Sequence, residues 1–239
     1  MTRRNPWISK ADWTPLPKGE IDVWKFSLTL RKNDRNILSQ DELERFNRTD
    51  SKPTNERKIA CRAQLRRILS LYTSTDPSKI SFEYGQNQKP LLPRHSDLSF
   101  NLSHSENMGL VAVTYSRRVG IDLEYLKTER PFAKIAERFL TKTENDFING
   151  FPEEECSRAF YRIWTLNEAY LKALGTGLTI SSNDFSIVPD NDRGRFLQDT
   201  KVADDLTQTW MFETIKVDNS YLGALCFEDL DTKTRFWKV

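Results

Sequence analysis

Residues 119–124 read Val-Gly-Ile-Asp-Leu-Glu, and the fold that we predict for the chain is built outward from this stretch. Apolar residues alternate with Gly120, Asp122 and Glu124, which is the period of a β-strand with two different faces. Two carboxylates therefore share a face and can reach a single cation, and the missing side chain of Gly120 leaves room for a close approach. Oxygen ligands of this kind suit Mg²⁺, which completes its shell with water and phosphate oxygens. In isolation, an exposed strand face with two solvated acids is the more common origin of such a pattern.

The same order of elements is predicted on either side of this point. Before it, strand, short helix, long helix and three strands are predicted at 21–28, 38–46, 55–73, 80–84, 98–103 and 110–115. From residue 119 onward, a strand, two short helices, a long helix and three strands are predicted at 119–124, 131–140, 141 onward, 152–174, 185–188, 207–217 and 221–227. We therefore predict an α+β fold of two similar halves, residues 1–116 and 117–239, with a ligand site in the cleft between them.

Composition narrows the class of protein. The 239 residues are 29% charged and 38% hydrophobic, which is typical of a soluble globular protein. A net charge of +2 gives no reason to expect a nucleic-acid partner. No apolar run is long enough to span a bilayer, so no membrane partner is expected. The three cysteines are widely spaced and the N-terminus lacks the apolar segment of a signal peptide, which favours a reduced, cytoplasmic chain.

The long helix predicted at 152–174 carries Glu168 and Lys172 on one face, because residues four apart are neighbours on a helix. The ordinary interpretation is a surface ion pair that stabilises the helix by about 0.2–0.5 kcal/mol. The functional alternative assigns Glu168 to a metal or to proton abstraction and Lys172 to a phosphate group.

Three further basic side chains are candidates for anion binding. His104 follows the strand at 98–103, where a histidine is more often structural than functional. Arg57 begins a helix, and Lys89 lies in the segment Gln88-Lys89-Pro90. Scattered bases are usually solvated, but two or three that converge can bind a phosphate monoester.

The joint order of these segments is more specific than any one of them. Phe-Asn-Leu-Ser-His-Ser at 100–105 is followed by Gly-Ile-Asp-Leu-Glu at 120–124 and by W-T-x-x-E-A-Y-L-K-A-x-G-x-G-L at 164–178. This order resembles the 4′-phosphopantetheinyl transferase superfamily, and most closely its monomeric, pseudo-dimeric type, which serves carriers of polyketide, fatty-acid and nonribosomal-peptide synthesis. The resemblance covers about residues 38–227. It implies two α+β halves with the active site in the cleft between them.

The resemblance also implies an activity and a set of site residues. Proteins of this family transfer the phosphopantetheine arm of coenzyme A to a serine of an apo acyl or peptidyl carrier protein, and release adenosine 3′,5′-bisphosphate. By this resemblance Asp122, Glu124 and Glu168 match the Mg²⁺ ligands, and Glu168 also matches the candidate base. The residues that match catalytic or coenzyme A contacts are Arg57, Lys89, Pro90, Ser103, His104 and Lys172.

The chain departs from the family pattern at two positions. Asn167 stands where the family commonly has a lysine, so a positive charge is missing and weaker activity is expected. Gln88 stands where the family commonly has a glycine, which alters the local turn. Two other functions remain open: a degenerate paralogue that binds coenzyme A or a carrier with little turnover, and a metal-dependent phosphoesterase.

Overall fold

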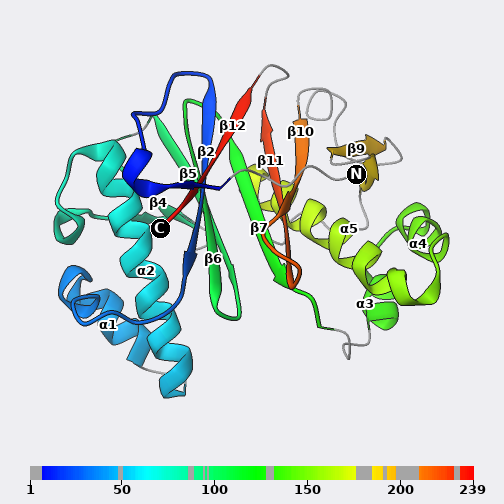
Figure 1. The fold of residues 1–239 in the computed structure, drawn as a ribbon, viewed down its shortest axis with the longest axis horizontal. Coiled ribbons are helices and arrows are strands. Elements are labelled where there is room, and N and C mark those ends of the chain that lie inside the picture. The colour runs from blue at the N-terminus through cyan, green and yellow to red at the C-terminus, as the bar shows by residue number, and fades with distance from the viewer. Residues whose placement is uncertain are drawn as a thin grey trace.

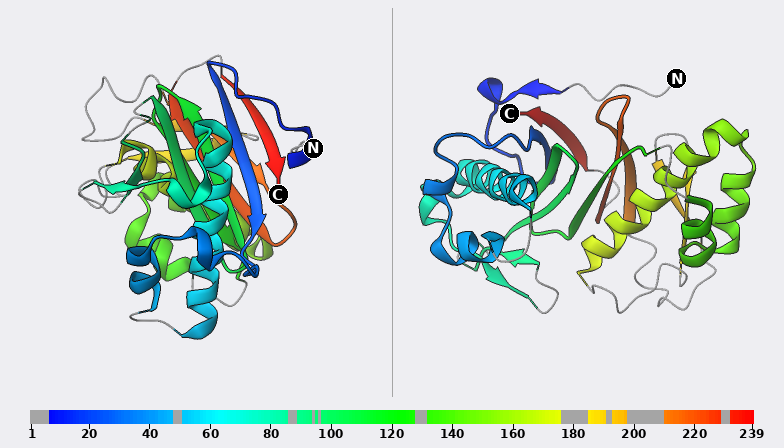
Figure 2. Two further views of the ribbon diagram at one scale, coloured as in Figure 1. Left: turned by 90° about the vertical axis from the view of Figure 1, so that its left-hand side faces the viewer. Right: turned by 90° about the horizontal axis from the view of Figure 1, so that it is seen from below.

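The computed structural model describes residues 7–47, 51–85, 89–93, 95, 97–127, 132–175, 185–190, 193–197, 210–228 and 232–239. Two five-stranded sheets stand next to each other, with helix α2 (Lys52–Thr73) on the outer side of the first and helix α5 (Glu153–Leu174) on the outer side of the second (Figure 1). The right-hand view of Figure 2, seen from below, shows the same layers, with helices outside and strands between them. The predicted α+β class is confirmed.

The two sheets share the order of three antiparallel strands. The first runs β1 (Ile8–Ser9), β12 (Lys233–Lys238), β2 (Glu20–Ser27), β6 (Met108–Tyr115) and β5 (Leu98–Ser105). The second runs β7 (Val119–Tyr125), β11 (Tyr221–Glu228), β10 (Trp210–Lys216), β9 (Arg193–Leu197) and β8 (Ser186–Asp190). In the first sheet, β5 and β6 form an antiparallel hairpin, and β2 pairs with β6. In the second sheet, β10 and β11 form such a hairpin, and β7 pairs with β11. The strands β2, β6 and β5 therefore correspond to β7, β11 and β10.

The last strand returns to the first sheet. β12 pairs in parallel with β2, although its residues lie in the second half of the chain. The predicted boundary between residues 116 and 117 therefore follows the chain order, whereas the first sheet draws its strands from both sides of that boundary. The division into two domains at this point stays a prediction.

The helices follow from local signals in the sequence. They are α1 (Gln40–Asn47), α2 (Lys52–Thr73), α3 (Phe132–Phe139), α4 (Lys142–Asn149) and α5 (Glu153–Leu174), with single 3₁₀ turns at Lys10–Asp12, Arg35–Ile37 and Pro77–Lys79. The residues Thr141-Lys142-Thr143-Glu144 have the sequence of a capping box, and α4 begins with one: Thr141 accepts from the amide of Glu144, whose carboxylate accepts from the Thr141 amide. Gly175 ends α5 with φ at 69°, a conformation that glycine adopts without cost.

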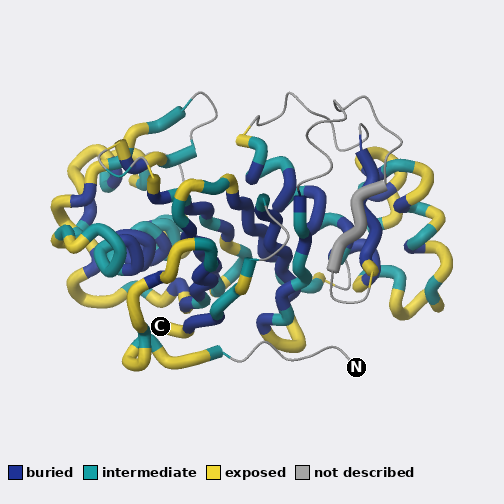
Figure 3. The backbone as a smooth tube through the Cα atoms, turned by 90° about the horizontal axis from the view of Figure 1, so that it is seen from above, coloured by how far each residue is buried: buried dark blue, intermediate teal, exposed yellow. Residues whose placement is uncertain are grey.

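Three apolar layers hold the sheets and helices together. α2 packs on the first sheet with Cys61, Leu65 and Leu69 in its buried stripe. Between the sheets, Ile121 and the other apolar residues of β7 pack on the inner face of the first sheet. α5 covers the outer face of the second sheet. Buried residues run through the middle of the molecule from one sheet to the next (Figure 3).

Some of the predicted elements need correction. The strand predicted at 80–84 is reduced to β3 (Glu83–Tyr84), which forms a small hairpin with β4 (Pro90–Leu91). β1, β4, β9 and β12 were not predicted, because short strands with mixed composition carry little periodicity. Within the described residues, none of the helices combines the length and the apolar character that crossing a bilayer requires.

Candidate active site

The polar face of β7 lies under α5. A Cβ at Gly120 would stand 2.0 Å from the carbonyl oxygen of Ala169 and 2.4 Å from the amide nitrogen of Ala173. The close approach that a glycine permits here is therefore that of the α5 backbone. This contact brings the side chains of α5 next to the carboxylates of β7.

Asp122 is buried, with 4% of its surface exposed. Its Oδ1 accepts from Lys172 Nζ at 2.6 Å and from Ser103 Oγ at 2.9 Å. Its Oδ2 is buried, and none of the residues that the structure describes forms a hydrogen bond to it. The interpretation of this strand face as exposed and solvated is thus wrong for Asp122. A buried carboxylate with one open oxygen is costly unless a cation or a donor completes it.

Glu168 lies beside this pair, one helical turn before Lys172. It is half-buried, and loss of hydration followed by the charge of Asp122 raises its pKa, while Lys172 acts in the opposite direction. Lys172 forms its ion pair across to Asp122 of β7, so its role extends beyond that of a surface pair along the helix. A carboxylate with a raised pKa in a cleft suits proton abstraction from a weak acid.

The predicted metal ligands are only partly assembled. Glu124 is two residues beyond Asp122 and accepts from Ser105 Oγ at 3.4 Å. Within the part of the chain that the structure describes, no three His, Cys, Asp or Glu side chains come close enough together to hold a metal ion. The ammonium of Lys172 supplies the positive charge at Asp122 in this arrangement. The open Oδ2 of Asp122, beside the half-buried Glu168, nevertheless fits a divalent cation, because hard oxygen ligands are what Mg²⁺ requires.

Positive charges converge on the end of β5. Partial loss of hydration, and then the charges of Lys172, Lys58 and Arg57, lower the pKa of His104, whose side chain is still exposed. His104 is therefore a neutral hydrogen-bond donor among three cations near pH 7. Such a group binds phosphate, since each anionic oxygen finds a donor and a charge. Lys58 was not among the predicted site residues, although its position directly after Arg57 at the start of α2 was available as a signal.

Arg57 is held by an acid from the turn between β5 and β6. Its guanidinium donates to Glu106 at 3.1 Å, and Lys127, which follows β7, contacts the same carboxylate at 2.6 Å. These contacts, the hydrogen bond from Lys127 first, lower the pKa of Glu106. A phosphate that binds Arg57 would therefore compete with the carboxylate of Glu106.

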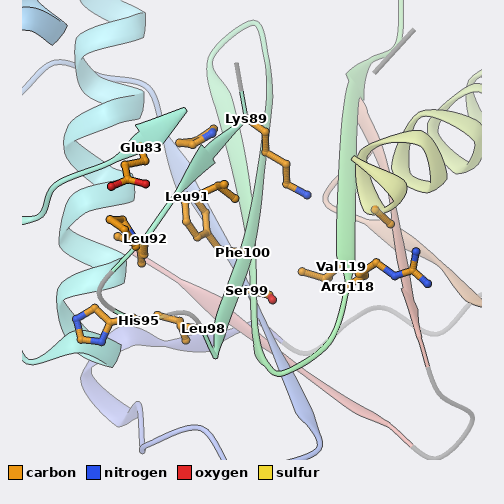
Figure 4. A pocket seen from close by; sticks show the side chains of 13 residues that line it. Glu83, Lys89, Leu91, Leu92, His95, Leu98, Ser99, Phe100, Arg118 and Val119 are labelled. Carbon is orange, nitrogen blue, oxygen red and sulfur yellow. The ribbon is translucent and has the colours of Figure 1, made fainter. Parts of the chain in front are cut away.

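Lys89 connects the β3–β4 hairpin to α5. Its Nζ donates to the carbonyl oxygen of Lys172 at 2.9 Å, at the negative end of the helix dipole, and burial lowers its pKa. Lys89 and Pro90 line a cavity of about 320 Å³ between the hairpin, β5, β7 and the end of α5. Apolar side chains such as Leu91, Phe100 and Val119 form much of its wall (Figure 4). The cavity is bounded by strands of both sheets, and Ala173, the residue after Lys172 in α5, lines it.

Two further residues that the sequence analysis singled out, Ser103 and Asn167, are buried. Ser103 is buried and its hydroxyl contacts Asp122, Lys172 and the amide of Leu123, at 2.9, 3.0 and 3.2 Å. Asn167 is buried, and its amide donates to Glu144 Oε1 at 3.0 Å, on the side of α5 that faces α4. Gln88 and the Gly-x-Gly-Leu segment at 175–178 lie outside the described residues, apart from Gly175.

Comparisons with known proteins identify the family of the chain. The family model described as the 4′-phosphopantetheinyl transferase superfamily matches residues 118–226. The chain is 31% identical over 243 residues to the 4′-phosphopantetheinyl transferase HetI of Nostoc sp., covering 98% of each protein. It is 29% identical to the 4′-phosphopantetheinyl transferase Sfp of Bacillus subtilis, over 83% of this chain and 87% of that protein.

A solved holo-(acyl-carrier-protein) synthase of Bacillus anthracis aligns with 47% of this chain at 22% identity and a TM-score of 0.38, a structural similarity too low to add to the sequence relationship. The relationship to HetI covers nearly the whole of both proteins, and the family match covers β7 and α5, which carry Asp122, Glu168 and Lys172. The chain therefore belongs to the 4′-phosphopantetheinyl transferase superfamily.

Proposed function

We propose that this protein transfers the 4′-phosphopantetheine group of coenzyme A to a serine of an apo acyl or peptidyl carrier protein. The serine oxygen bonds to the β-phosphorus, the bond from that phosphorus to the bridging oxygen breaks, and adenosine 3′,5′-bisphosphate leaves. The observation that carries the proposal is the convergence of Asp122, Glu168 and Lys172 between β7 and α5, beside the cations around His104.

Each of these side chains has a role in the transfer. Glu168 accepts the proton of the carrier serine, a weak acid that needs a positioned base near neutral pH. Lys172 and His104 donate to the phosphate oxygens, where negative charge builds as the bridging bond breaks. The ammonium of Lys172 is paired with Asp122 in the structure, so a phosphate oxygen of the substrate replaces Asp122 as its anionic partner.

Mg²⁺ is the cation that we propose for this site, held by Asp122, Glu124 and Glu168. When bound, it neutralises the charge of the pyrophosphate. The proposal for coenzyme A contacts is Arg57, Lys89, Pro90, Ser103, His104 and Lys172. Lys89 and Pro90 have the support of the cavity that they line, and Arg57 has the support of its place among the cations around His104.

The remaining parts of the proposal concern the protein as a whole. We propose a cytoplasmic monomer, since the two sheets pack on each other within one chain and the three cysteines form no disulfide. The partners are coenzyme A and a carrier protein, without nucleic acid or membrane.

One assay tests the reaction. The protein is incubated with coenzyme A, Mg²⁺ and a panel of apo carrier proteins, and a mass gain of one phosphopantetheine on a carrier is the expected result. Asp122→Ala and Glu168→Ala should abolish the gain, because they remove the cation ligand and the base. Glu154→Ala, at an exposed position in the first turn of the same helix, is the matched control and should transfer at the wild-type rate.

The same assay separates the alternatives. Tight coenzyme A binding without a mass gain on any carrier would indicate a binding protein. Release of free phosphopantetheine without carrier modification would indicate a phosphoesterase. Transfer that survives at the wild-type rate in Asp122→Ala would contradict the assignment of the metal ligands.

A further inference from the structure

Among the strands that the structure describes, β7 is the outermost of its sheet, and it pairs through its backbone with β11 only. Its other edge crosses the face of β5, which belongs to the first sheet. Amide groups at such an edge need partners if they are buried. Three of them donate to side chains of β5: Ile121 to Asn101 Oδ1 at 2.9 Å, Leu123 to Ser103 Oγ at 3.2 Å and Tyr125 to Ser105 Oγ at 3.0 Å.

These contacts form a regular ladder. The acceptors are every second residue of β5, and the donors are every second residue of β7, so the side chains that point to one face of β5 meet the amides that point to one edge of β7. The side chains of Asn101, Ser103 and Ser105 thus accept hydrogen bonds from the amides of β7, as the carbonyl groups of a neighbouring strand would. We call these three residues the β5 ladder.

Two residues of the β5 ladder also hold carboxylates. Ser103 donates to Asp122 Oδ1 at 2.9 Å, and Ser105 donates to Glu124 Oε2 at 3.4 Å. A hydroxyl has one proton to donate and two lone pairs to accept with, so a serine can take an amide and hold a carboxylate together. Asn101 accepts in the same way, but the β7 residue before its donor is Gly120, which has no side chain to hold.

The hydroxyl of Ser103 is fully used within the protein. Its one proton goes to Asp122, and its lone pairs accept from the amide of Leu123 and from Lys172 Nζ at 3.0 Å. It therefore has no proton left to donate to a substrate phosphate unless the bond to Asp122 breaks. The coenzyme A contact that we propose for Ser103 therefore requires one of these bonds to break, and in the structure its hydroxyl instead orients Asp122 and Lys172.

We infer that the β5 ladder is a positioning device that sets where the carboxylates of Asp122 and Glu124 point. Ser103 orients Asp122 together with Lys172, and Ser105 orients Glu124. The ladder joins the two sheets at the active site, so the spacing of the two carboxylates depends on contacts from the opposite sheet. The role that we assign to this spacing, to hold a divalent cation against a pyrophosphate, rests on the proposed function. The hydrogen bonds of the β5 ladder are independent of that function.

The first test measures the ladder without any reaction. Ser105→Ala removes one acceptor, and the amide of Tyr125 should exchange its hydrogen faster by about fivefold to tenfold, the worth of one hydrogen bond. Ser105→Thr keeps the hydroxyl and should restore slow exchange. Ser99→Ala is the matched control: Ser99 lies on the same face of β5, and among the described residues its side chain makes no hydrogen bond to β7. Unchanged exchange of Tyr125 in Ser105→Ala would overturn the inference.

The second test measures the positioning of the carboxylate. Mn²⁺ is titrated into the full-length protein in the presence of coenzyme A and followed by electron paramagnetic resonance. Ser105→Ala should bind Mn²⁺ about tenfold more weakly, as is usual when a hydrogen bond behind a metal ligand is lost, and Ser105→Thr should recover the affinity. In the transfer assay, Ser105→Ala should need a correspondingly higher Mg²⁺ concentration for half-maximal rate while its KM for coenzyme A stays unchanged.

The outcomes separate this inference from the proposed function. If the wild-type protein modifies no carrier, the proposed function fails, and the Mn²⁺ titration and amide exchange still decide the ladder. If transfer occurs but Ser105→Ala keeps the wild-type affinity for Mn²⁺, the positioning role is wrong. A loss of stability in Ser105→Ala without a change in Mn²⁺ affinity would likewise contradict it.

Discussion

Gly120 lies where the backbone of α5 crosses β7 at contact distance. A methyl group there would overlap the carbonyl oxygen of Ala169 and the amide of Ala173, and backbone atoms cannot move aside as a flexible side chain can. We predict that Gly120→Ala lowers the free energy of unfolding by about 3 kcal/mol, the upper end for overpacking. It should also reduce transfer, since α5 carries Glu168 and Lys172. Urea denaturation and the transfer assay measure the two effects.

Gly150 provides the comparison at the same scale. A Cβ at Gly150 would lie 3.4 Å from its nearest neighbour, the carbonyl oxygen of Phe147, which is an ordinary contact at the end of a helix. Gly150→Ala should therefore leave both stability and transfer close to wild type. Equal effects of the two substitutions would show that the packing of α5 on β7 is looser than the structure implies.

At the scale of elements, α4, α5 and β8 meet at one buried carboxylate. Glu144 accepts from Thr141 at the start of α4, from Asn167 of α5 and from the amide of Ile187 in β8. Loss of hydration raises its pKa above the ordinary value of 4.5, and these hydrogen bonds lower it only in part. Asn167, which departs from the family pattern, therefore serves this junction.

The raised pKa of Glu144 predicts how stability depends on pH. The folded protein keeps the proton of Glu144 to a higher pH than the unfolded chain does, so its contribution to stability is fully present below 4.5 and is lost as pH rises through the folded pKa. We predict that the free energy of unfolding of wild type relative to Glu144→Gln declines as pH rises above the ordinary pKa of 4.5 toward neutral pH. Urea denaturation across this range measures it.

Asn167→Ala sharpens this test. It removes a hydrogen bond that lowers the pKa of Glu144, so the decline of stability with pH should extend to higher pH than in wild type. Parallel pH profiles for wild type and both variants would contradict the prediction. Comparing the free energies of unfolding of wild type and Asn167→Ala also shows whether Asn167 contributes to the stability of the protein.

At the scale of the whole molecule, Asp22 joins both ends of the chain to the first sheet. It is fully buried in β2 and accepts from Trp13 near the N-terminus, Tyr72 of α2, and Arg235 and Trp237 of β12. We predict that Asp22→Ala lowers the free energy of unfolding by about 3–5 kcal/mol, since it removes the nearest anion of Arg235 and the acceptor of the donors from Trp13, Tyr72 and Trp237. Thermal or urea unfolding of the full chain measures the loss.

Glu20 is the matched control for Asp22. It lies on the same strand and contacts the same arginine at 3.6 Å, but it is only half-buried. Glu20→Ala should cost about 0–1 kcal/mol, as is usual for an accessible ion pair. A loss at Asp22 no larger than that at Glu20 would mean that β12 is not fastened through this carboxylate.

Much of the local structure was predictable because it depends on neighbours in the sequence. The strand at 119–124, the capping box at 141–144 and the long helices are confirmed, since alternation, capping and helical periodicity act over a few residues. The order of the three motifs, a property of the sequence alone, pointed to the family that the comparisons confirm.

The sequence by itself thus determined the long helices, the strand at 119–124, the family and most of the candidate residues. Only the tertiary structure decided that Asp122 is buried against Lys172, that Asn167 faces Glu144, and that β12 joins the first sheet. These outcomes depend on contacts between residues far apart in the chain. Burial of a charge and the partner that compensates it are properties of such contacts, so no local pattern of residues can specify them.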